Sequence, residues 1–274
     1  PTVVNLLTPI IAQHLFHTNT TDIRVYRFLY PILTVGGILL CIIVYKHTEE
    51  KIVQAKTHVI QIRFLDALKA VAKNKYFWII SLAGWLGFLE GSSAVLVNWT
   101  FNYSDGGAHK VYMGLATTLI SNAALWAMML APFAIKLMGK RNLLIVHNTI
   151  NVFLYLILFF VYKNVLLMCI VVYLNTFVNT FQNVYMANIQ ADMRDYHQWK
   201  TGVRVDGLFG PLGMIGTVIG LFTGMFYPYI YESLGLKSDY TVLYDDAIRS
   251  NIFEALIFWS AIGAVLNLLP FFFY

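Results

Sequence analysis

Charged residues are scarce in this sequence. Its 274 residues include 19 Lys or Arg and 14 Asp or Glu, together 12%, whereas 58% are hydrophobic. The mean hydropathy of +0.64 excludes a water-soluble fold of this size, which would need a more polar surface. The sequence therefore predicts an all-α polytopic membrane protein.

Cysteine is also scarce, and histidine is not clustered. The two cysteines, Cys41 and Cys169, lie inside apolar runs, so we expect packing residues and no disulfide. The seven histidines fall at span ends and in loops, and no His or Cys pair has the spacing of metal ligands. We therefore expect no metal site and no cofactor. A membrane-embedded enzyme, which needs paired acid and base groups, remains only an alternative.

Apolar runs long enough to cross a bilayer recur along the chain. Runs of about 17 to 25 residues suit a membrane helix. The sequence predicts eight such helices, near residues 1–16, 26–45, 77–101, 111–135, 143–162, 165–191, 207–230 and 250–273. Because the chain starts without Met and ends inside an apolar run, we interpret it as a fragment of a longer protein.

Basic residues are distributed unequally over the connections between these spans. Segments 46–76, 136–142 and 193–206 hold thirteen Lys or Arg, and the alternate connections hold six. The positive-inside rule places the first group in the cytoplasm. The net charge of +5 then has a topological explanation, and no nucleic-acid partner is expected.

A polar stretch, residues 192–207, reads DMRDYHQWKTGVRVDG and forms a predicted hinge between two membrane helices. It resembles the signature loop of the glycoside-pentoside-hexuronide:cation symporters, a branch of the major facilitator superfamily, whose pattern is roughly D-x-x-D-Y-G-E-W/Y-K-x-G-x-R-x-E-G. The matching positions are Asp192, Asp195, Tyr196, Trp199, Lys200, Gly202, Arg204 and Gly207. Three positions depart from the pattern, with His197 in place of Gly, Gln198 in place of Glu and Asp206 in place of Glu.

This resemblance implies the major facilitator fold, in which a long cytoplasmic link joins two six-helix halves. Residues 1–47 would then end the N-terminal half, 48–76 form the link, and 77–274 make the C-terminal six-helix half, with the N-terminal four helices missing. The resemblance also implies a cytoplasmic gate of ion pairs, built from Asp192, Asp195, Lys200, Arg204 and Asp206. A solvated turn is the alternative for this loop. By the same resemblance, the membrane is a bacterial inner membrane.

The predicted link contains the segment FLDALKAVAKNK. Phe64, Leu68 and Val71 recur there at helical spacing, while Lys69 and Lys73 take another face. The pattern favours an amphipathic helix on the inner membrane surface, and a solvated linker is the alternative.

Amide side chains gather on one face of the predicted span 165–191. The members are Asn175, Asn179, Gln182, Asn183 and Gln190, which fall within an arc of about 100° on a helix. Amides facing lipid are costly, so this face should look onto a cavity or a neighbouring helix. The functional interpretation is a pathway for a hydroxyl-rich substrate such as a sugar, and the alternative is hydrogen bonding between helices.

Glu90 is the one ionisable residue deep within an apolar run. A carboxylate in a membrane is by default a candidate proton or cation site or a substrate anchor, and a purely structural carboxyl is the alternative.

Asn122 and Trp126, one turn apart, offer a second polar and aromatic patch for a sugar, although packing is the commoner role of such a Trp. The span 207–230 carries Gly213, Gly216, Gly220 and Gly224 on one face, which predicts close helix packing along that face.

These patterns together predict a secondary active transporter that moves a sugar or glycoside by alternating access, coupled to Na⁺ or H⁺. Relatives in the resembled family carry a Lys in the helix after the signature loop, and this chain has none there. We therefore expect the site of the coupling cation in the missing N-terminal helices. A non-transporting sensor on the same fold is the other alternative. The oligomeric state does not follow from the sequence.

Overall fold

The computed structural model describes residues 8, 11, 15–16, 23–47, 69, 71–91, 93–202, 206–237 and 239–274, with the backbone alone for 206–213. Contacts divide the chain into two compact units, 1–61 and 62–274. The boundary falls inside the predicted link 48–76. The assignment of these units to the two halves of a larger fold stays a prediction.

The first unit contains one long helix, α2, which runs Ile23–His47. Its 25 residues are roughly 37 Å long, enough to cross the hydrocarbon core of a bilayer. Most of its large apolar side chains are exposed, as a lipid-facing helix requires. The predicted span 26–45 is confirmed, whereas the predicted span 1–16 lies largely outside the described residues.

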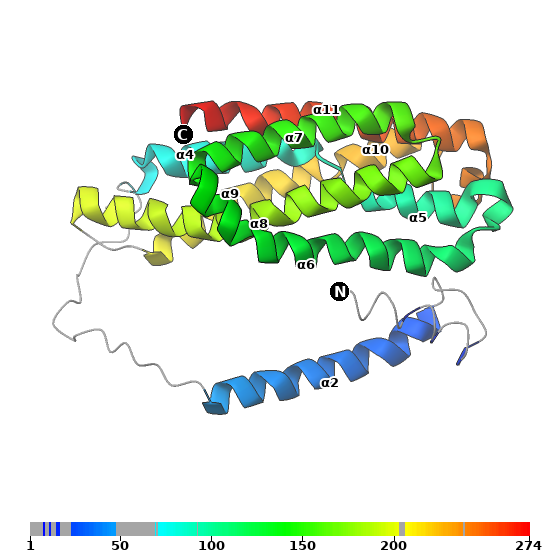
Figure 1. The fold of residues 1–274 in the computed structure, drawn as a ribbon, viewed down its shortest axis with the longest axis horizontal. Helices are drawn as coiled ribbons and strands as arrows, with labels where there is room; N and C mark the ends of the chain where they lie inside the picture. The colour runs from blue at the N-terminus through cyan, green and yellow to red at the C-terminus, as the bar shows by residue number, and fades with distance from the viewer. Residues whose placement is uncertain are drawn as a thin grey trace. The chain divides into compact units, whose positions relative to one another are not determined.

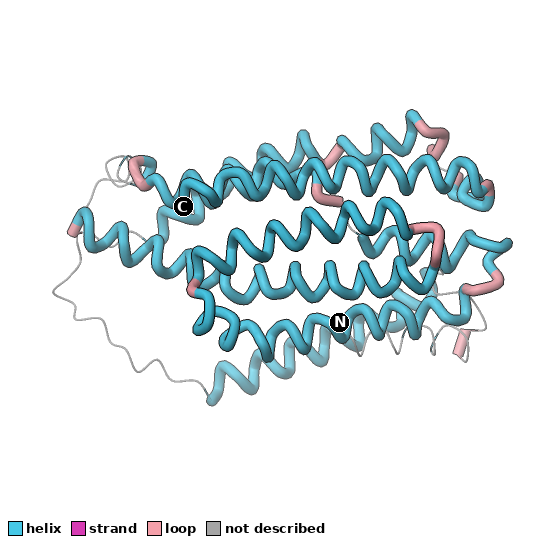
Figure 2. Tube along the Cα trace, turned by 45° about the horizontal axis from the view of Figure 1, so that its top comes forward, coloured by secondary structure: helices cyan, strands magenta, loops and turns pink. Residues whose placement is uncertain are grey.

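The second unit is built from helices that lie alongside one another (Figures 1 and 2). Their bounds are α4 Lys75–Leu86, α5 Ser93–Tyr103, α6 Met113–Met138, α7 Lys140–Val161, α8 Val165–Thr201, α9 Asp206–Thr223, α10 Phe226–Ser233 and α11 Asp246–Leu268. Seven segments in the described part of the chain, counting α2, are long and apolar enough to span a membrane. No strand occurs among those residues. The prediction of an all-α polytopic fold is confirmed.

Three predicted boundaries differ in the structure. The span expected at 77–101 is broken into α4, a short 3-10 turn η2 at Gly87–Leu89, and α5. The span expected at 207–230 is likewise divided into α9 and α10. The prediction of a hinge starting at Asp192 was wrong, because α8 continues to Thr201. No proline or glycine interrupts residues 192–201, and the helix ends at Gly202, whose φ of 71° suits glycine.

Small residues allow two of the long helices to pack closely. Ala123, Ala127 and Ala131 on α6 are fully buried and recur every four residues, and α6 packs against α8. Among the described residues of the glycine face predicted on 207–230, Gly216 makes a close contact with another helix, since an added Cβ would lie 2.6 Å from Trp85 Nε1 of α4. The surroundings of Gly213 lie outside the described part of the chain. At Gly220 no described atom lies within 4 Å of such a Cβ. The sequence therefore predicted close packing at Gly216, and the alanine face of α6 was not predicted.

The end of the predicted amphipathic helix packs against α4 and α8 within the second unit. Val71 is fully buried in a cluster with Phe77 of α4 and Met193 of α8. Lys69 and Lys73 are exposed, as the predicted polar face requires. Phe64 and Leu68 lie outside the described residues.

Candidate functional site

The candidate site lies at the break between helices α4 and α5. After the 3-10 turn η2, Glu90 takes an extended conformation, with φ −74° and ψ 94°. Helix α11 comes so close that a Cβ on Gly263 would lie 2.6 Å from the backbone nitrogen of Glu90. A Cβ on Gly91 would lie 2.8 Å from Leu256 Cδ1 of the same helix. The break is thus packed between neighbouring helices.

Side chains of three other helices satisfy the backbone groups that the break frees. Gly91 N donates to Ser260 Oγ of α11 at 3.0 Å. Tyr155 of α7 donates its hydroxyl to Gly91 O at 3.3 Å, and Tyr227 of α10 donates to Leu89 O. Irregular backbone within a membrane protein requires such internal partners, because lipid supplies none.

The carboxyl of Glu90 is the centre of a network of amides. Asn151 of α7 donates to Oε1, and Asn267 of α11 donates to Oε2 at 3.3 Å. Asn175 of α8 donates to Asn151 Oδ1 at 2.6 Å. Ser93 Oγ and the side-chain amide of Asn179 donate to Asn175 Oδ1 at 2.9 and 3.2 Å. Four helices are therefore joined through one carboxyl and its neighbours.

The network combines deeply buried amides with one ionisable group, the carboxyl of Glu90. Asn151 and Asn175 are 1% and 2% exposed, whereas Glu90 is only half-buried. Asn267 Oδ1 is buried and has no hydrogen-bond partner among the described residues. No Lys or Arg forms a salt bridge with Glu90 within that part of the chain. Chemically, the site offers a reachable carboxyl for a proton, a cation or a hydroxyl, beside an amide oxygen that can accept.

The structure brings together some of the residues predicted for the substrate pathway and separates others. Asn175 and Asn179 lie in the network with Glu90. Gln182 is half-buried further along α8, and Asn183 is exposed. Asn122 on α6 is half-buried and Trp126 is 51% exposed, and neither joins the hydrogen bonds around Glu90 among the described residues.

Sequence reasoning missed the partners that hold Glu90. Asn151 and Asn267 are polar residues within long apolar runs, and that is the signal that could have found them.

The placement of all histidines at span ends or in loops was wrong for His147. This residue is 3% exposed within α7, one turn from Asn151, and its ring packs edge to face on Tyr185 with centroids 5.9 Å apart.

The residues predicted for a cytoplasmic gate lie at the end of α8 and beyond. Asp192 forms a salt bridge of 2.6 Å with Lys140, the first residue of α7. Asp195 and Lys200 are exposed. Asp206 begins α9, where the backbone alone is described, and Arg204 lies outside the described residues. The observed ion pair is within the second unit, and a role in gating stays a prediction.

Comparison with known proteins shows the family to which the chain belongs. A family model described as MFS/sugar transport protein matches residues 2–274. The chain belongs to that family. A curated relative, the isoprimeverose transporter of Lactiplantibacillus pentosus, is 28% identical over 204 residues, which cover 70% of this chain and 40% of the relative. The chain thus aligns with less than half of that relative's length. No solved structure matches.

Membership of the MFS/sugar transport protein family confirms the predicted class of protein. The chain is a multi-pass integral membrane protein of a transporter family, and an embedded enzyme is not supported. The described residues contain no group of three or more His, Cys, Asp or Glu side chains able to hold a metal ion.

Proposed function

We propose that this chain is part of a secondary transporter that moves a sugar or glycoside by alternating access. The observation that carries the proposal is the half-buried carboxyl of Glu90, placed at a helix break and held by amides from α7 and α11. The family match and the resemblance to an isoprimeverose transporter support a sugar as the substrate class.

The amide network suits the chemistry of a sugar. Each hydroxyl of a sugar both donates and accepts a hydrogen bond, and Asn side chains offer both functions. Asn267 Oδ1, buried without a partner among the described residues, is an acceptor available to a substrate hydroxyl. A buried polar atom of this kind is uncommon in a protein interior and favours a binding role.

The break provides a means of coupling binding to movement. Helices α4 and α5 are not joined by a continuous ladder of backbone hydrogen bonds, so each can tilt separately about Glu90. The Asn151 and Asn267 amides donate to the carboxyl, and a proton or Na⁺ arriving there competes with these bonds. A ligand that favours one arrangement of the two helices then shifts the balance between access states. We include coupling to Na⁺ or H⁺ in the proposal on this ground.

The test uses the full-length protein reconstituted in vesicles, with isoprimeverose as the first substrate and a panel of other glycosides beside it. Glu90→Gln keeps the shape of the side chain and removes its charge. We expect uphill accumulation under an imposed Na⁺ or proton gradient to fall at least tenfold, while exchange of labelled for unlabelled sugar stays within a few-fold. Glu232→Gln, at an exposed residue of α10, is the matched control. Unchanged accumulation in the Glu90 variant, or no exchange of any sugar by the parent, would refute the proposal.

A further inference from the structure

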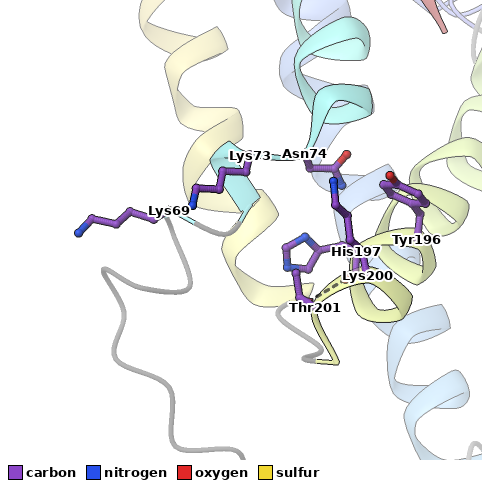
Figure 3. Close-up of a pocket in the computed structure, with 7 residues that line it drawn as sticks. All are labelled: Lys69, Lys73, Asn74, Tyr196, His197, Lys200 and Thr201. Carbon is purple, nitrogen blue, oxygen red and sulfur yellow. Dashed lines mark hydrogen bonds between the residues drawn. The ribbon is translucent and has the colours of Figure 1, made fainter.

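A basic pocket lies where α8 ends beside the start of α4, and it shares no residue with the hydrogen-bond network around Glu90. Its volume is about 440 Å³, and it is lined by Lys69, Lys73, Asn74, Tyr196, His197, Lys200 and Thr201 (Figure 3). Three of these residues carry a fixed positive charge, and no Asp or Glu is among them. An enclosure with this lining attracts anions.

The surrounding structure strengthens the positive potential. Asn74 is the N-cap of α4, so the positive end of that helix dipole points to the pocket. The carboxylate of Asp192, one turn before Tyr196 on α8, is engaged by Lys140 at 2.6 Å, and Asp195, next to Tyr196, is exposed to solvent and outside the lining. His197 and Gln198 stand where the resembled pattern has Gly and Glu, so this chain has one more ring in the lining and one acidic residue fewer beside it.

The position of the pocket along α8 indicates the depth at which an anion would meet it. The 37 residues of α8 are roughly 55 Å long, whereas a bilayer with its headgroup regions is about 40–45 Å thick. If Val165 begins at one membrane surface, Tyr196 lies roughly 46 Å along the helix, at the outer edge of the headgroups on the other side. The positive-inside rule makes that side the cytoplasmic one. Exposed Lys73 and Lys200 therefore lie at the aqueous edge of the headgroups, from which their long side chains can reach lipid phosphates.

We propose that this pocket binds a phosphate-bearing anion, of which the headgroup of an anionic phospholipid in the inner leaflet is the source favoured by its depth. Lys73 and Lys200 would pair with the phosphate, and the ring of Tyr196, over which Lys200 Nζ lies at 5.9 Å, would contact the apolar part of the headgroup region. Basic pockets at the cytoplasmic ends of membrane helices bind such headgroups in other proteins.

The experiment measures lipid binding to the purified full-length protein in detergent by native mass spectrometry. The probes are phosphatidylglycerol, phosphatidylcholine and inorganic phosphate. We expect the parent to bind phosphatidylglycerol at least tenfold more tightly than phosphatidylcholine. The double variant Lys73→Gln, Lys200→Gln should lose about tenfold or more of that affinity, since each Lys near a lipid surface contributes about fivefold.

The control variant is Lys136→Gln, Arg141→Gln, which removes the same charge from exposed residues on the same side of the membrane. We expect its lipid affinity to change less than twofold. Displacement of phosphatidylglycerol by millimolar phosphate would identify a free phosphate compound as the ligand, and resistance to displacement would identify the lipid. Equal losses in both double variants, or no preference for the anionic lipid, would overturn the proposal. Should the pocket variant fold poorly, either single Lys→Gln change carries the same test with an expected loss of about fivefold.

Discussion

Asn175 donates a hydrogen bond of 2.6 Å to Asn151 Oδ1, and this contact joins α8 to α7 inside the core. Asn151 in turn donates to Glu90. The bond between two neutral amides thus fixes which way the Asn151 amide faces, and leaves its NH₂ group directed at the carboxyl. The hydrogen bond that Glu90 receives from Asn151 therefore depends on Asn175, which does not contact Glu90.

The first prediction tests that dependence. Asn175→Leu keeps the volume but leaves Ser93 Oγ and the Asn151 amide without their partner, so we expect a loss of about 1–3 kcal/mol of stability. Thermal unfolding of the purified protein in detergent measures it. Asn183→Leu, at an exposed amide of the same helix, should leave the midpoint nearly unchanged. Equal midpoints for both variants would show that the network does not stabilise the fold.

The second prediction concerns the close approach of α11 to the helix break. Gly263→Ala places a Cβ against the backbone of Leu89 and Glu90, at 2.7 and 2.6 Å, and backbone atoms cannot move aside without shifting the helix. We expect a destabilisation of about 1–3 kcal/mol, as for overpacked cores, together with slower sugar exchange. Gly220→Ala, with no described atom within 4 Å, is the control. A Gly263→Ala protein with parental stability would mean that the backbone of Leu89 and Glu90 moves aside at little cost in free energy.

Part of this site could be predicted from the sequence. Run length identified the spans, because the bilayer fixes how many apolar residues a helix needs. The helical period identified the amide face of α8, with Asn175 at its buried end. The break at Glu90 could not be derived in the same way, since Gly87 and Gly91 are compatible with a continuous membrane helix. The pairing of Glu90 with Asn151 and Asn267 depends on how α7 and α11 pack, which no local pattern encodes.

The third prediction concerns the ion pair at the inner end of α7 and α8. Lys140 and Asp192 are both partly exposed, so their salt bridge should contribute only about 0–1 kcal/mol. Asp192→Asn should therefore change the transport rate more than the unfolding midpoint, if the pair forms in one access state only. Exchange of the two charges, Lys140→Asp with Asp192→Lys, should restore the rate measured in vesicles. A double variant as slow as the single one would assign the effect to something other than pairing.

The fourth prediction concerns topology. After Cys41 and Cys169 are changed to Ser, single cysteines at Arg141 and Lys200 should react with an impermeant maleimide only from the cytoplasmic side. Cysteines at Lys163, in the connection between α7 and α8, and at Lys237, in the connection after α10, are exposed and should react only from outside. Labelling of position 141 from outside would reverse the assignment of the two sides.

The helix break also bears on how the protein enters the membrane. Helices α4 and α5 have 12 and 11 residues, roughly 18 and 16 Å each, so neither alone crosses a hydrocarbon core of about 30 Å. The acidic residue between them opposes insertion, by about 2.5–3.5 kcal/mol if a carboxylate is placed at a helix centre. Its amide partners are synthesised later, Asn151 by 61 residues and Asn267 by 177. The segment therefore reaches its final position only when α11 has left the ribosome and packed beside it, and a chain that ends before α11 would hold Glu90 without its second partner.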